Sequence, residues 1–167
     1  ATREALERCR ALLGEHTLLM TLQNGGGHEE TLSEFAPMER ILIGTTQHNA
    51  SVREDGSVFH GGSGKTVVGS PLGENADARR VAEEFARAGV ASEYSDNIRA
   101  TVWQKLMTNA SLSALTGVFQ MPMGFITDSA SAWALCQALV REACDVARAD
   151  GVCFDVEERI AAVRAVS

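Results

Sequence analysis

The sequence predicts an α/β domain followed by an all-α domain, and three observations lead to this prediction. Up to residue 95, short apolar segments typical of buried strands alternate with amphipathic helical segments. From Asp96 onward no strand-like segment recurs, and every later segment has a helical pattern. The chain also begins with a helical segment that leads directly into a strand, which is half of a β-α-β unit. We therefore expect one domain over residues 1–95 and a second over residues 96–167.

The first domain is expected to hold buried strands, a hairpin and three helices. An initial helix ends at Gly14, and a glycine-rich turn follows the first strand. Two strand-like segments flank Gly61-Gly62-Ser63-Gly64, which predicts that they pair as a β-hairpin. The expected strands lie at residues 17–22, 40–46, 57–60, 66–69 and 90–94, and the expected helices at residues 5–13, 29–35 and 75–88.

The second domain is expected to hold three helices. The first runs over residues 97–119, with Ser95 or Asp96 as its cap, and a turn around Pro122 follows it. The second runs over residues 129–150, and a third begins near Asp155. The last helical pattern of the second domain runs to the end of the chain. The helix that opens the first domain has no strand before it. Both ends therefore look like cuts within a longer protein.

Composition narrows the class of protein. The 167 residues are 45% hydrophobic and 22% charged, as in a globular protein, and their net charge of -7 argues against nucleic-acid binding. No apolar run is long enough to cross a membrane, and no signal peptide is recognisable. The four cysteines form no Cys-X-X-Cys pair, and no metal site is expected. Free, reduced thiols are typical of a cytoplasmic protein.

Candidate catalytic chemistry lies on the helix that begins near residue 97. Lys105, Asn109 and Ser113 are spaced by four residues, so a regular helix places them in one stripe. Ala110 and Ala114 are expected on the apolar side of this stripe, and Ser111 on the wet face. A half-buried lysine has a lowered pKa and is a better proton donor near neutral pH. The alternative is a lysine whose stem lies on the core while its ammonium stays in water.

A second candidate site follows the first strand, at Leu22-Gln23-Asn24-Gly25. An amide and bare backbone at the carboxyl edge of an open α/β sheet are suited to ligand binding. The alternative is an ordinary Asn-Gly turn. His48, which follows the second strand, is expected to face a cleft. The chain contains no Gly-X-Gly-X-X-Gly fingerprint.

Several motifs together resemble the ketopantoate reductase (2-dehydropantoate 2-reductase) family over nearly the whole chain. They occur in the order Leu22-Gln23-Asn24-Gly25, GTTQHNA from Gly44, HGGSGKTVVG from His60, Asp96-Asn97-Ile98-Arg99 and WQKLMTNASLSALTG from Trp103. The resemblance implies a partial Rossmann-type sheet without its N-terminal strands, joined to a helical substrate and dimerisation domain. It also implies NADPH as cofactor, a small 2-oxo acid as substrate and a possible homodimer.

The resemblance also assigns roles to residues. Lys105 matches the lysine that protonates the alkoxide formed by hydride transfer, and Asn109 matches a substrate-binding asparagine. Asn24 matches an asparagine between cofactor and substrate, and Ala50 falls where the backbone approaches the cofactor. The family's glycine-rich cofactor loop and its later substrate-binding residues lie outside residues 1–167. The chain alone is therefore expected to be inactive and prone to associate.

Two positions depart from the family pattern. Ser113 and Met123 stand where the family usually has asparagines that hold the substrate's polar groups. A reductase of another small 2-oxo acid is therefore an alternative to a ketopantoate reductase. A non-catalytic assembly module that has lost NADPH binding is a second alternative.

Overall fold

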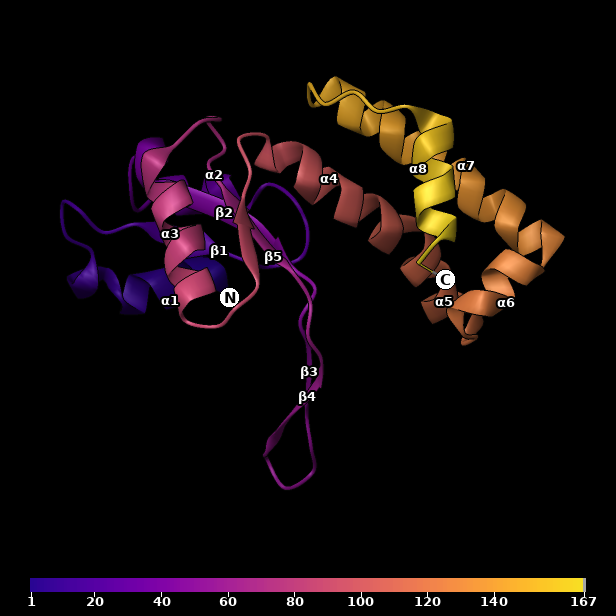
Figure 1. The fold of residues 1–167 in the computed structure, drawn as a ribbon, viewed down its shortest axis with the longest axis horizontal. Coiled ribbons are helices and arrows are strands. Elements are labelled where there is room, and N and C mark those ends of the chain that lie inside the picture. Colours follow the sequence, from indigo (N-terminus) through magenta and orange to yellow (C-terminus); the bar gives the residue numbers. More distant parts are fainter. Residues whose placement is uncertain (167) are drawn as a thin grey trace. The chain divides into compact units, whose positions relative to one another are not determined.

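The computed structural model describes residues 1–166, and the chain divides into two compact units, Ala1–Val102 and Trp103–Ser167. The first unit is an α/β unit, and the second is helical (Figure 1). The predicted fold class is confirmed. None of the helices within residues 1–166 is long and apolar enough to cross a membrane.

The first unit is built on a four-stranded mixed sheet in the order β1-β2-β5-β6. β2 (Ile41–Thr46) pairs in parallel with β1 (Leu19–Thr21) and antiparallel with β5 (Thr66–Gly69). β6 (Ser92–Tyr94) lies parallel to β5 at the other edge. Around the sheet are α1 (Thr2–Arg8), α2 (His28–Ser33) and α3 (Ala76–Arg87), with short 3₁₀ turns η1 (Arg10–Leu12) and η2 (Met38–Arg40).

β2 is central because both of its faces are covered. Ile41 and Ile43 pack on one side with residues of β1, α2 and the start of α4 (Ile98–Thr108), whereas Leu42 packs on the other side against β5 and α3. A strand buried on both faces reads as a continuous apolar run, which made this strand predictable. Gly44 has no room for a side chain, since a Cβ there would collide with the backbone of Val67.

The predicted hairpin is wrong in its pairing. The segment after residue 57 is β4 (Val58–Gly62), and it pairs with β3 (Asn49–Val52) rather than with β5. β5 instead enters the main sheet between β2 and β6. The glycine-rich connection allows this because Gly64 packs directly on Gln47, where a Cβ would not fit. The β3–β4 hairpin extends away from the sheet (Figure 1), and its side chains are nearly all exposed.

The helical unit contains one helix more than expected. Its elements are the end of α4 (Ile98–Thr108), a π-helical turn η3 (Asn109–Ser113), α5 (Ala114–Phe119), α6 (Met123–Asp128), α7 (Ala130–Ala149) and α8 (Val156–Arg164). The segment predicted as a simple turn around Pro122 therefore leads into α6. Asn97, rather than Ser95 or Asp96, caps α4, because its Oδ1 accepts a hydrogen bond from the Ala100 amide at 3.3 Å.

The core of the helical unit lies between η3, α5, α6, α7 and α8. Its buried members are Met107, Leu112, Leu115, Ile126, Ala132, Trp133, Cys136, Val140, Cys144, Ala147, Ile160 and Val163. Burial raises the pKa of the Cys136 and Cys144 thiols, which keeps them neutral at ordinary pH. Ser129 and Asp155 cap α7 and α8 through their side-chain oxygens, which accept from the Ala132 and Glu158 amides.

Candidate functional site

Lys105 lies in the last turn of α4, in a partly buried position. Removal from water lowers the pKa of Lys105 below its ordinary value of 10.5, because burial penalises the charged form. The predicted direction of this shift is confirmed. On the same helix, the Trp103 indole N–H donates to Asp150 Oδ2 at 2.8 Å, which ties this helix to the end of α7. A partly buried lysine with a lowered pKa is suited to donate a proton near neutral pH.

Asn109 and Ser113 are the first and last residues of the π-turn that follows Lys105, and both are partly buried. They bring an amide and a hydroxyl onto the turns next to the lysine. The expected faces of this helix are wrong at three positions. Ser111, expected on the wet face, is fully buried, whereas Ala110 and Ala114, expected beside the apolar face, are exposed. The exposure of Ala114 follows from the wider π-turn, which a regular 3.6-residue period does not anticipate. Ser111 comes four residues after the buried Met107, so it lies on the core side even in a regular helix, and its expected face was wrong for that reason.

Met123, the other position that departs from the family pattern, begins α6 and is 38% exposed. Pro122 precedes it in an extended conformation, as expected for the residue before a helix start. Phe119 and Phe125 meet edge to face with ring centroids 6.5 Å apart. Apolar side chains therefore gather at this end of the helical unit.

Asn24 belongs to the α/β unit and lies in the exposed turn after β1. Its carbonyl oxygen accepts a hydrogen bond from His28 Nε2 at 3.0 Å, and Gly25 and Gly27 take positive φ angles of 108° and 77°. Since β1 and β2 are parallel, the residues that follow them, Asn24 and His48, leave the sheet at the same edge. Ala50 lies exposed in β3, directly opposite His60 of β4.

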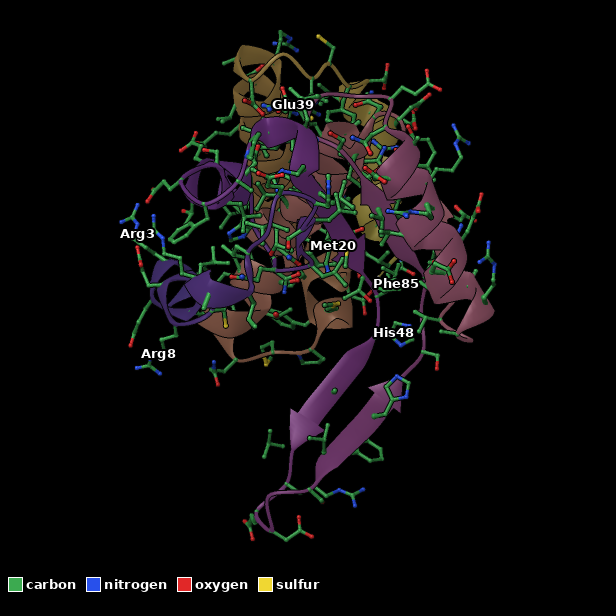
Figure 2. All side chains as sticks on the ribbon, turned by 90° about the vertical axis from the view of Figure 1, so that its left-hand side faces the viewer. Arg3, Arg8, Met20, Glu39, His48 and Phe85 are labelled. Atoms are coloured by element: carbon green, nitrogen blue, oxygen red, sulfur yellow. The ribbon has the colours of Figure 1, made fainter. Side chains whose placement is uncertain are left out.

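The histidine pair at the base of the hairpin is a feature that the sequence did not predict. His48 Nδ1 lies 3.1 Å from His60 Nε2, and the two rings stack with centroids 5.3 Å apart. Figure 2 shows His48 where the hairpin leaves the sheet. Its Nε2 atom is buried and has no hydrogen-bond partner within residues 1–166. The sequence pairs the β4 segment with β5, whereas its pairing with β3 is what brings His60 beside His48.

The candidate residues therefore form two groups, one in each unit. Asn24 and Ala50 belong to the α/β unit, and Lys105, Asn109 and Ser113 to the helical unit. Among residues 1–166, no group of three or more His, Cys, Asp or Glu side chains is placed to hold a metal ion.

Comparison with known proteins covers both units. The family model described as "Ketopantoate reductase PanE/ApbA" matches residues 1–73, and the one described as "Ketopantoate reductase PanE/ApbA C terminal" matches residues 97–167. The 2-dehydropantoate 2-reductase of Halobacterium salinarum is 34% identical over 137 residues, which cover 81% of this chain and 45% of the relative. The 2-dehydropantoate 2-reductase of Pyrococcus horikoshii is 31% identical over 157 residues, which cover 93% of this chain and 51% of the relative.

Solved structures give the same relationship. A ternary structure of D-mandelate dehydrogenase with NADH and anilino(oxo)acetate is 28% identical, with a TM-score of 0.90, and the match covers 98% of this chain and 53% of that one. The 2-dehydropantoate 2-reductase of Geobacter metallireducens is 26% identical, with a TM-score of 0.81. This match covers 99% of this chain and 57% of that one. The chain spans about half the length of the relatives it matches. The chain belongs to the ketopantoate reductase family.

Proposed function

We propose that the protein containing this chain reduces 2-dehydropantoate to pantoate with NADPH, and that Lys105 is its general acid. The curated relatives at 34% and 31% identity are 2-dehydropantoate 2-reductases, which supports this substrate. The observation that carries the proposal is Lys105 itself, a partly buried lysine whose pKa burial lowers, followed on the same helix by Asn109 and Ser113. The product would serve pantothenate and coenzyme A synthesis.

The proposed chemistry requires a proton at one oxygen of the substrate. Bound NADPH would supply a hydride to the 2-oxo carbon, and negative charge would develop on the attached oxygen. An ammonium beside that oxygen stabilises charge that appears only in the transition state, and then donates the proton. A lowered pKa makes Lys105 a stronger acid for this step. Asn109 and Ser113 would hold the carboxylate and the hydroxyl group of the substrate.

The α/β unit offers a surface that fits the cofactor. The Asn24 side chain is exposed at the carboxyl edge of the parallel pair β1 and β2, and no atom would obstruct a ligand near the Cβ positions of Gly26 and Gly27. Such an edge is where open α/β sheets bind nucleotides. Ala50 is exposed on β3. We assign Asn24 to the cofactor and the substrate, and Ala50 to the cofactor.

The experiment is NADPH oxidation by the complete protein with 2-dehydropantoate, compared with its Lys105→Ala variant. Loss of a general acid lowers kcat by roughly 10²- to 10⁴-fold, and we expect a fall in this range. Gln104→Ala is the matched control, since Gln104 is the exposed neighbour of Lys105 on the same helix, and it should retain activity. Turnover that survives Lys105→Ala would remove the lysine from the mechanism.

A second candidate function is the reduction of a different 2-oxo acid. The D-mandelate dehydrogenase structure holds anilino(oxo)acetate, and its TM-score of 0.90 with this chain favours this candidate. Ser113 and Met123 favour it too, because a hydroxyl and a thioether replace amides that would bind a polar substrate. Comparing kcat/KM for 2-dehydropantoate with that for aromatic and branched 2-oxo acids, with NADPH and then NADH, decides between the two. Absence of turnover with every acid would support a non-catalytic module.

Two further expectations belong to this proposal. The complete protein is expected in the cytoplasm and as a homodimer. Sedimentation of the complete protein checks the dimer, and a monomer at micromolar concentration would contradict it.

A further inference from the structure

The buried side chains of the helix that carries Lys105 do not fit a regular α-helix. Met107, Leu112 and Leu115 are 1%, 0% and 5% exposed and belong to one core cluster. With about 100° of rotation per residue, a regular helix would point Leu112 about 140° and Leu115 about 80° away from Met107. Three side chains spread this widely would not reach the same core.

The π-turn at Asn109–Ser113 resolves this conflict. A π-turn acts like the insertion of one residue, so each later residue points where its predecessor would point in a regular helix, a change of about 100°. Leu112 and Leu115 then lie within about 40° of Met107. Ala114 moves off the core face by the same rotation, which agrees with its exposure.

The same rotation changes the relation of Ser113 to Lys105. In a regular helix Ser113 would lie about 80° around the axis from Lys105, whereas beyond the π-turn it lies about 20° from it. Asn109, at the start of the turn, stays about 40° from the lysine. The turn therefore lines up the ammonium, the amide and the hydroxyl on one side of the helix while the apolar residues remain in the core.

Ser111 holds the turn from inside. Its side chain is fully buried, and its Oγ donates to the Met107 carbonyl oxygen at 2.6 Å. A serine that bonds to the carbonyl four residues earlier distorts the local helix. The Ser111 side chain also lowers the pKa of the Cys136 thiol of α7, against the larger effect of burial, so the two side chains lie close together in the core. Ser111 is thus anchored at both the helix backbone and the core.

We infer that Ser111 is a positioning residue for the proposed reaction: by holding the π-turn it keeps Ser113 and Asn109 in line with Lys105 without touching the substrate. The inference rests on the proposed function, because alignment matters only if these three side chains meet one substrate. A polar residue that was expected on the solvent side of the helix therefore has its role inside the core.

The first test compares Ser111→Ala with the unaltered complete protein. Misplacement of binding groups by about 1 Å can cost 10²-fold in rate, and we expect kcat/KM for the 2-oxo acid to fall by roughly 10- to 100-fold. The fall should appear in KM for the acid and in kcat, whereas the Kd for NADPH should stay unchanged. An unchanged kcat/KM, or a loss shared equally by NADPH binding, would overturn the inference.

The second test removes the need for the turn by deleting Ala110, which is exposed. The deletion leaves Met107, Leu112 and Leu115 at the i, i+4 and i+7 positions of a regular helix, and Ser113 seven residues from Lys105. The deletion variant should therefore fold and retain activity. In this background Ser111→Ala should still lower Tm, since the bond to the Met107 carbonyl is lost, but it should no longer lower kcat/KM.

The outcomes separate two kinds of failure. If Ser111→Ala lowers kcat/KM equally in both backgrounds, Ser111 acts through packing alone and the inference fails. Failure of the Ala110 deletion variant to fold would also contradict it, because the core stripe should survive. If Lys105→Ala leaves turnover intact, the proposed function itself fails, whatever Ser111 does.

Discussion

The helix that carries Lys105 and the neighbouring helix α7 contribute to the same core but solve the packing problem differently. After the adjacent pair Ala132 and Trp133, the buried residues of α7 recur at every third or fourth position, namely Cys136, Val140, Cys144 and Ala147. Along α4, η3 and α5 the buried set changes frame at the π-turn, between Met107 and Leu112. Only the helix that carries Lys105 holds candidate catalytic groups.

The difference lies in the demands on the two helices. α7 has to present one apolar face, and a regular period does this without distortion. The Lys105 helix has to present an apolar face and a polar face at fixed angles to each other, and one extra residue in the turn adjusts both. Burial also has different consequences: it holds the Cys136 and Cys144 thiols neutral by raising their pKa, and it lowers the pKa of Lys105.

The largest effect expected from this comparison is on stability at Leu112. Leu112→Ala should lower the free energy of unfolding by about 2–5 kcal/mol, because the side chain is fully buried. Denaturant unfolding followed by tryptophan fluorescence measures this, since Trp133 lies in the same core. Val118→Ala, at an exposed position nearby, is the control. A loss at Leu112 no larger than that at Val118 would mean that the helix is regular and Leu112 faces water.

The pH dependence of kcat/KM comes next. The protonated form of Lys105 is the active acid, so activity should fall as pH rises through its pKa, about tenfold per pH unit. Burial lowers this pKa, so the fall should begin below pH 10.5. The fall of kcat/KM at high pH should disappear in Lys105→Ala. A fall that persists in the variant belongs to another group. A fall centred at the ordinary pKa of lysine would contradict the burial of Lys105.

The smallest effect is expected at Ala114. Ala114→Glu should change the free energy of unfolding by no more than about 0.5 kcal/mol, because the position is exposed beyond the π-turn. In a regular helix the same position would lie about 20° from Met107, and a charge there would be buried in the core. A loss of several kcal/mol in thermal or denaturant unfolding would therefore argue against the change of frame.

Local signals made much of the fold predictable. Asn75 caps α3 by accepting from the Ala78 amide at 2.9 Å, and Gly89 ends the helix with a φ of 85°. Both residues mark the helix in the sequence. The hairpin failed because strand pairing is a long-range choice. β3 has no buried residue and hence no alternating pattern, so its partner β4 was assigned to the nearest recognisable strand.

The candidate site was predictable in its residues but not in its geometry. Lys105 and its lowered pKa follow from its place beside an apolar face, whereas the π-turn leaves no periodic signal in the sequence. Exposed Ala114 looks misplaced only against a regular helix. Such departures from local rules are expected at functional sites, where packing and chemistry make separate demands.

The most direct test of the proposed role of Lys105 is a crystal structure of the complete protein with NADP⁺ and pantoate bound. Lys105 Nζ should lie within about 3.2 Å of the 2-hydroxyl oxygen, which is the oxygen that receives the proton in the reductive direction. The Asn109 amide and the Ser113 hydroxyl should contact the same ligand from the same side of the helix. A pantoate whose hydroxyl meets another proton donor, with Lys105 turned to water, would contradict the proposed mechanism.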